Sequence, residues 1–181
     1  IRDTIGRSDI LVVQLECLLR LVRLEPNPEP VQRFVDRSTH LLEVLEGERR
    51  WPELADWLSR LRAVSAGFHE SRPDVAEVIA AHLAGFCTVY RAARLVELAG
   101  RDADGRAAAG AILEALGPGA APALLEAVRS QAVDSKDSRA ALQLLCDHAA
   151  LVAPALVVAL DRADDADGLP RAIARGRGRV L

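Results

Sequence analysis

The 181-residue sequence has no methionine, a single lysine, Lys136, and only 3% aromatic residues. The lone lysine disfavours a P-loop, a kinase-type lysine and a pyridoxal Schiff base, since each of these sites depends on a placed amino group. With so few aromatic rings, leucine, alanine and valine must build the core, because apolar residues make up 50% of the chain. This length suffices for one compact domain or a short repeat array.

Excess charge and long apolar runs are also missing. The 26 acidic and 23 basic residues give a net charge of -3, so nucleic acid is not the expected partner. The longest apolar stretch, residues 149–160, contains Pro154 and is shorter than the roughly 18 to 20 residues that a membrane-spanning helix needs. We therefore expect no membrane span.

Cysteine is scarce and oddly numbered. Cys17, Cys87 and Cys146 lie far apart and cannot form a closed disulfide framework, which favours a reducing, cytoplasmic location. The chain starts at Ile1 without a basic and then apolar leader, and we expect it to be a segment of a longer protein.

Helical periodicity dominates what is present. Over residues 31–45 the apolar side chains recur at i, i+3 and i+4 and again about two turns later, as on one face of a helix. A similar stripe covers residues 10–24, and the proline-rich residues 25–30 are expected to connect the two helices. Further helices are expected from Trp51, after Pro73 and over residues 88–99. Since no useful segment alternates with period two, we expect no sheet.

The strongest pattern is an internal repeat with a period of 32 residues. Residues 121–128 return as residues 153–160, which aligns Pro122 with Pro154. Upstream, residues 108–109 and 112–113 match residues 140–141 and 144–145 at the same offset. The turn at residues 102–105 reappears, residue for residue, at 165–168. Such periodicity indicates stacked structural units that share one core.

Each unit contains the signals of a helical pair. An aspartate or serine is expected to cap the first helix, and residues 117–119, Gly-Pro-Gly, to reverse the chain. A proline is then expected in the first turn of the second helix. The core positions are predicted to include Leu125 and Leu144.

The paired helices resemble the HEAT and phycobilisome-lyase HEAT-like repeats, with Leu116 and Gly117 ending one helix and residues 121–125 opening the next. The resemblance covers about residues 104–162, two full units, and residues 168–181 are similar to the first helix of a third. It implies an all-α, right-handed α-solenoid of antiparallel helical hairpins, HEAT-like in the C-terminal half. We expect residues 1–100 to form a helical hairpin layer of solenoid type and residues 101–181 to form the HEAT-like repeats.

Chemical sites are weakly indicated. Cys146 with His148, and His82 with Cys87, are the nearest metal-ligand groupings, but neither has a second half at zinc spacing. The Asp-Ala-Asp-Gly turns lack the first ligand and the bidentate glutamate of a calcium loop, and they are better explained as helix caps. No serine nucleophile motif with an ordered triad occurs. We expect no metal, no cofactor and no catalytic residues.

The expected function follows from the resemblance, because such repeats mostly act as interaction scaffolds. We expect a non-catalytic module that binds a protein partner, or neighbouring domains of the parent chain, along the second helices of successive pairs. Two alternatives stay open: a nucleic-acid-binding HEAT-like module, for which the arginines at residues 171–179 are the candidates, and an enzyme of the HEAT-like lyase or glycosylase kind. The candidate partner-binding residues are Glu126, Arg129, Ser130, Val158, Asp161 and Arg162.

Overall fold

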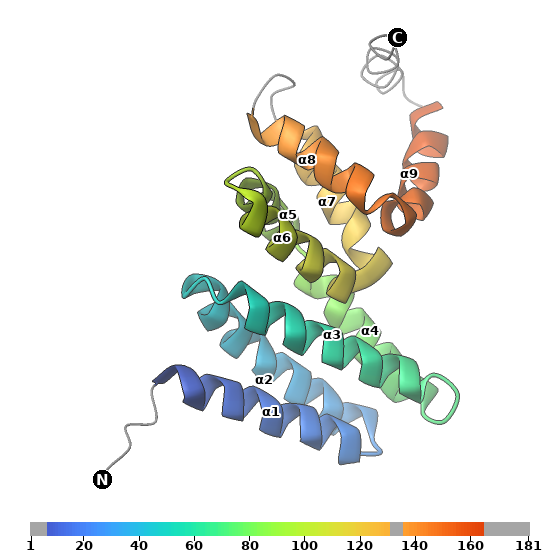
Figure 1. Ribbon diagram of the computed structural model, residues 1–181. Helices are drawn as coiled ribbons and strands as arrows, with labels where there is room; N and C mark the ends of the chain where they lie inside the picture. Colours follow the sequence, from blue (N-terminus) through green and yellow to red (C-terminus); the bar gives the residue numbers. More distant parts are fainter. Residues whose placement is uncertain (1–6, 131–135, 165–181) are drawn as a thin grey trace, which may run out of the picture.

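The computed structural model describes the backbone of residues 7–130 and 136–164, and the side chains of residues 10–130 and 139–158. Within these ranges the regular structure is entirely helical, which confirms the predicted all-α class for the described part of the chain. The elements, shown in Figure 1, are α1 (Arg7–Leu24), α2 (Pro28–Gly47), α3 (Trp51–Phe68), α4 (Pro73–Phe86), α5 (Val89–Ala99), α6 (Ala103–Leu116), the 3-10 turn η1 (Gly117–Ala120), α7 (Ala121–Arg129), α8 (Lys136–Asp147) and α9 (Ala149–Asp164).

Prolines and polar caps mark where helices begin. α2, α3 and α4 each have proline in the first turn, where the missing N–H removes no helical hydrogen bond. The predicted connector over residues 25–30 is therefore too long, because Pro28 and Pro30 belong to α2. Thr88 caps α5 by accepting from the Arg91 N–H at 3.2 Å, and Asp102 caps α6 by accepting from the Gly105 N–H at 2.7 Å. The capping role predicted for the turn at 102–105 is confirmed.

The helices follow one another through the molecule in chain order, from α1 at one end to α8 and α9 at the other (Figure 1). In that view α1, α3, α6 and α8 lie in front, with α2, α4, α5 and α7 behind them. α3 packs extensively against both α4 and α6, while α5 packs against α6 and α7. α4 and α5 meet at an angle of 62° across residues 87–88, so the two short helices together fill the space behind α3 and α6.

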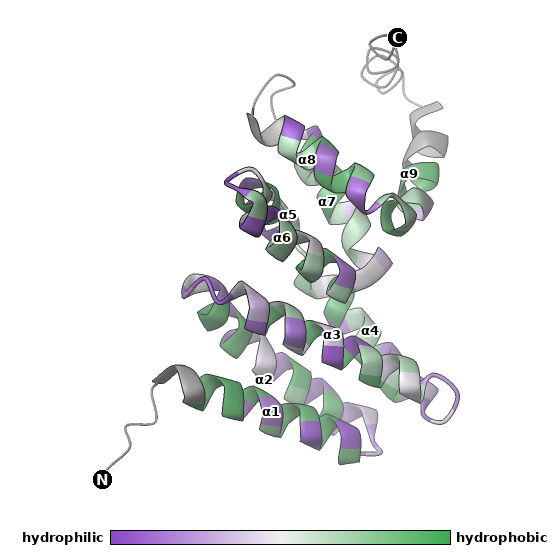
Figure 2. Cartoon of the chain, in the orientation of Figure 1, coloured by the Kyte–Doolittle hydropathy of each residue, from purple (hydrophilic) through white to green (hydrophobic). Residues whose placement is uncertain are grey.

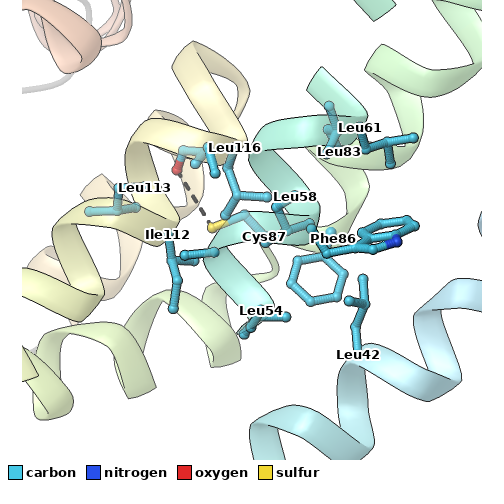
Figure 3. Close-up of a cluster of buried hydrophobic side chains, with 14 of the residues drawn as sticks. Leu42, Leu54, Leu58, Leu61, Leu83, Phe86, Cys87, Ile112, Leu113 and Leu116 are labelled. Atoms are coloured by element: carbon cyan, nitrogen blue, oxygen red, sulfur yellow. Dashed lines mark hydrogen bonds between the residues drawn. The ribbon is translucent and has the colours of Figure 1, made fainter. Parts of the chain in front are cut away.

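One hydrophobic core runs through the described chain. Figure 3 shows its centre, where Leu58 and Leu61 of α3, Phe86 of α4 and Ile112 and Leu113 of α6 gather. A fully buried leucine stabilises a fold by about 1.5–3 kcal/mol, so this cluster is a major source of stability. The predicted division near residue 100 falls in the short turn between α5 and α6, and the core is continuous across it.

The 32-residue correspondence is visible in which side chains are buried. Ala109 and Ile112 of α6 are buried, and so are Ala141 and Leu144 of α8, 32 residues later. The same offset relates Ala120, at the end of η1, to Val152 of α9, and both are fully buried. The repeated positions therefore supply the same helix faces to the core.

The two units differ where their second helices begin. Gly117, at a φ of 74°, ends α6, and η1 then leads into α7 with Pro122 in its first turn. The corresponding residues of the second unit, 149–152, contain neither glycine nor proline. They therefore form the first turn of α9, and Pro154 lies inside that helix. The prediction that both prolines open a second helix is correct for Pro122 and wrong for Pro154. The second copy of the Asp-Ala-Asp-Gly turn and the expected partial third unit, residues 165–181, lie outside the described residues.

Apolar and polar residues are mixed along most helices (Figure 2), and one helical stretch has unusually high mean hydropathy. By length and composition, Ala103–Arg129 could cross a membrane. If the bent pairs α4–α5 and α8–α9 are each taken as a single span, up to three stretches of the described chain meet the same criterion. The stretch contains no long uninterrupted apolar run, because isolated charged residues such as Arg106 and Glu114 divide it, but its mean hydropathy stays high. Of its most apolar window, 56% is buried within the protein.

Leu144 offers a direct test of the core. Its side chain is fully buried, so Leu144→Ala is expected to lower the free energy of unfolding by about 2–5 kcal/mol. Leu142, on the same helix, is exposed, and Leu142→Ala should cost about 0.5 kcal/mol or less. Denaturant unfolding followed by circular dichroism measures both, and equal effects would refute the assigned core. Leu125, which was predicted to be a core position, is half-buried because Leu124 takes the innermost place on α7.

Candidate partner-binding surface

The predicted partner-binding residues lie on α7 and α9, which pack against each other. Glu126, Arg129 and Ser130, at the C-terminal end of α7, are exposed, as is Val158 of α9. Asp161 and Arg162 belong to α9, but their side chains lie outside the described residues. The structure thus puts four of the six predicted side chains on two neighbouring helices.

The chemistry of this α7–α9 surface is mixed. Arg129 Nη1 lies 3.5 Å from Glu126 Oε2, an exposed pair one turn apart that adds little stability. The Ser130 hydroxyl donates to the Ala127 carbonyl at 2.8 Å, so it helps to end α7. Val157 is exposed beside Val158, although its alignment with Leu125 placed it on the core side. The charged pair on α7 and the exposed aliphatic side chains on α9 can contact the surface of another protein. These side chains do not point together into a catalytic or metal site.

A second cluster of polar groups joins α2 to α5. Arg91 Nη2 lies 2.8 Å from Glu43 Oε1, and Arg91 Nε lies 3.3 Å from Glu46 Oε2. Arg94 Nη1 lies 3.5 Å from the other oxygen of Glu46, a residue that is largely buried. Arg91 also donates to the Phe86 carbonyl at 3.1 Å and lies over the Phe86 ring, 4.2 Å from its centroid. These contacts hold α5 at its angle to α4.

This ion cluster was missed by the sequence analysis, because Glu46 and Arg91 are 45 residues apart and no short spacing signals their contact. A narrow space beside the cluster is lined by Trp51, Leu54 and Cys87 and has a volume of about 10 Å³. Such a space accommodates about one water molecule. The cluster therefore joins helices and does not surround a ligand cavity.

Cys87 and His82, which a sequence reading could take for a ligand pair, are both shaped by burial. Cys87 Sγ lies 3.9 Å from the Ala120 carbonyl (Figure 3). Burial raises the pKa of the Cys87 thiol to about 11, with partial opposition from the Arg91 charge. The thiol is therefore protonated at neutral pH, which makes it a poor nucleophile and metal ligand.

His82 lies half-buried on α4, and its Nε2 is buried without a hydrogen-bond partner. Burial lowers the pKa of His82, and the Arg91 charge adds to this, while Asp36 opposes it. The imidazole is therefore neutral at pH 7.

The remaining histidines and cysteines lie in unlike surroundings. Cys146 is exposed on α8, whereas His148 is half-buried against Gly110, with its Nδ1 3.5 Å from Glu114 Oε1. No group of three or more metal-ligating side chains occurs among the described residues. Cys146 and His69, in contrast, are exposed, so both side chains are accessible to solvent.

The larger hollows on the described surface are open grooves. One of about 650 Å³ lies between α3, α4 and η1, and a second of about 380 Å³ lies between α6 and α8. In the first, the Arg62 guanidinium donates to the Glu114 carbonyl and the Ser65 hydroxyl donates to the Ala76 carbonyl at 3.0 Å. These polar groups already bond to backbone, so the groove presents few free groups for a small ligand.

Comparison with known proteins found no matching family model, no similar curated protein and no similar solved structure. Function therefore has to be argued from the described residues themselves.

The lowered pKa of His82 predicts a pH dependence of stability. An unfolded histidine titrates near 6.5, so below that pH the unfolded chain binds a proton that folded His82 resists. The stabilisation is complete above about pH 6.5 and is lost as the pH falls from there through the lower folded pKa. We expect His82→Leu to reduce the loss of unfolding free energy between about pH 7.5 and 5.5, measured by urea unfolding.

Exposed His69 provides the control for this measurement, since His69→Gln is expected to keep the wild-type pH dependence. An unchanged dependence in His82→Leu would show that the burial of His82 does not govern its protonation.

Proposed function

We propose that this chain is a right-handed α-solenoid of HEAT-like helical hairpins that acts as a non-catalytic protein-interaction module of a larger protein. Three features support the solenoid. The helices follow one another in chain order, α1, α3, α6 and α8 lie in front of α2, α4, α5 and α7 in Figure 1, and buried positions recur at an offset of 32 residues. Such units contact mainly their neighbours and leave a long continuous surface for binding.

The observation that carries the binding proposal is the exposed α7–α9 surface. Its exposed residues are Glu126, Arg129 and Ser130 at the end of α7 and Val158 of α9, and these two helices, the second helices of two successive proposed hairpins, pack against each other. A shallow patch that combines aliphatic side chains with an arginine and a carboxylate has the composition of a protein interface. The proposed partner is another protein or a neighbouring domain of the parent chain.

The alternatives receive less support from the described residues. Several arginines already pair with carboxylates, as Arg60 does with Glu16 and Arg101 with Glu97, which reduces the positive charge available for phosphates. The arginines of residues 171–179 lie outside the described residues. For an enzyme, half-buried His82 supplies only a neutral imidazole and buried Cys87 only a protonated thiol, and the space beside Cys87 measures about 10 Å³. A cytoplasmic location fits the free thiols of Cys17, Cys87 and Cys146.

A charge-reversal experiment tests the proposed surface. The double substitution Arg129→Glu with Val158→Glu is expected to reduce capture of a specific protein by the full-length parent from its native host at least tenfold, because it puts one new carboxylate beside Glu126 on α7 and a second on the exposed face of α9. The amount of the co-purifying protein, quantified by mass spectrometry, is the measurement.

The matched control is Arg101→Glu with Leu142→Glu, which changes one exposed arginine in the turn between α5 and α6 and one exposed leucine on α8. Circular dichroism first establishes that both variants fold. Equal capture by the two variants, or capture of labelled duplex DNA with a steep dependence on salt, would contradict the proposal.

A further inference from the structure

The outward face of α1 is apolar, although this helix stands at one end of the molecule. Ile10 is 47% exposed, Val13 58%, Leu21 44% and Leu24 79%, and Cys17 is exposed among them. On the opposite side of the same helix, the buried residues pack against α2 and α3; they are Leu11, Leu15, Leu19 and Val22. α1 is thus hydrophobic on two faces, of which only one is covered.

The neighbouring helix shows that this is unusual for the molecule. The exposed residues in the middle of α2 are polar or charged, namely Arg33, Asp36, Arg37, His40 and Glu43. A helix on the surface of a globular protein ordinarily presents such a polar outer face, because an apolar one promotes association. The outer face of α1 therefore has the character of an interface.

The spacing of the apolar residues on this face is symmetric about Cys17. Ile10 and Leu24 are each seven residues away from it, since 17 − 10 = 24 − 17 = 7, and Val13 and Leu21 are each four residues away. At 100° per residue, all of them fall within about 40° of the direction of Cys17. Suppose that a second copy of α1 packs antiparallel to the first, with the two-fold axis at Cys17. Ile10 of one copy would then lie at the level of Leu24 of the other, and Val13 at the level of Leu21.

The charges beside the apolar face select the antiparallel arrangement. Glu16 and Arg20 lie on the same flank, 3.3 Å apart, and the Arg20 side chain is 72% exposed. In the antiparallel pair, Arg20 of one copy comes within about two residues, or about 3 Å along the axis, of Glu16 of the other. In a parallel two-fold pair the two copies of this flank would lie on opposite sides of the contact, so Arg20 of one copy would not meet Glu16 of the other. The flank is therefore complementary to itself only in antiparallel order.

We propose that the outer face of α1 is the contact surface of an antiparallel homodimer, with Cys17 on its two-fold axis. Helices packed at about 8–10 Å, each with Cα atoms about 2.3 Å from its axis, leave facing Cα atoms about 3.4–5.4 Å apart. This range overlaps the Cα separation of a disulfide, about 4.4–6.8 Å, so the two Cys17 thiols can be cross-linked by an added oxidant.

Cross-linking of the full chain tests the geometry. Copper phenanthroline in air, which oxidises two thiols to a disulfide, is expected to give a covalent dimer on a non-reducing gel, and dithiothreitol should reverse it. Cys17→Ser should abolish the band, whereas Cys146→Ser should leave it unchanged, since Cys146 is exposed on a distant helix. Persistence of the band in Cys17→Ser would overturn the proposal.

Sedimentation equilibrium tests the association without an oxidant. Leu21→Glu is expected to convert the dimer to monomer while keeping the helical circular dichroism, and the matched variant Leu142→Glu should remain dimeric. Arg20→Glu should weaken the dimer about threefold at low salt, as expected for an exposed ion pair. A wild-type chain that is monomeric at about 100 μM, or a dimer indifferent to Leu21→Glu, would assign this face to another partner and refute the homodimer.

Discussion

The packing of α3 against α6 is the contact on which the rest of the structure depends. The two helices are far apart in sequence, yet Leu58 and Leu61 of one lie in the same buried cluster as Ile112 and Leu113 of the other (Figure 3). Burying such leucine and isoleucine side chains supplies the main favourable free energy in a chain with few aromatic residues. Because this contact crosses residue 100, the core continues across the predicted division between residues 1–100 and 101–181.

The bend between α4 and α5 follows from that constraint. Two short helices must connect α3 to α6 and still cover the buried cluster from behind, so the chain turns by 62° at residues 87–88. The turn is held by Arg91, which bonds to the Phe86 carbonyl and to both Glu43 and Glu46. The same geometry buries Cys87 and His82, so their shifted pKa values are consequences of packing. Perturbed titration is a guide to function only where a ligand can reach the group.

Local signals allowed much of the fold to be predicted from the sequence. Helical periodicity located the helices, and Asp102 and Pro122 were correctly placed at helix starts because capping and proline geometry depend on a few adjacent residues. Pro154 was misplaced because the segment before it has no helix-breaking residue. The candidate surface was only partly predictable: α7 and α9 followed from the repeat, but the exposure of Val157 depends on which helices surround α9. The ion cluster of Glu46 and Arg91 and the uncovered face of α1 also depend on tertiary neighbours, about which periodicity carries no information.

The continuity of the core across residue 100 is tested most directly by native-state hydrogen exchange under increasing denaturant. If α3 and α6 share one core, the slowest amides of both helices will exchange with the same free energy and the same denaturant dependence, and Leu113→Ala will lower the protection of α3 as much as that of α6. If α6 instead opens at lower free energy while α3 keeps its full protection, the two halves are separate folding units and the account is contradicted.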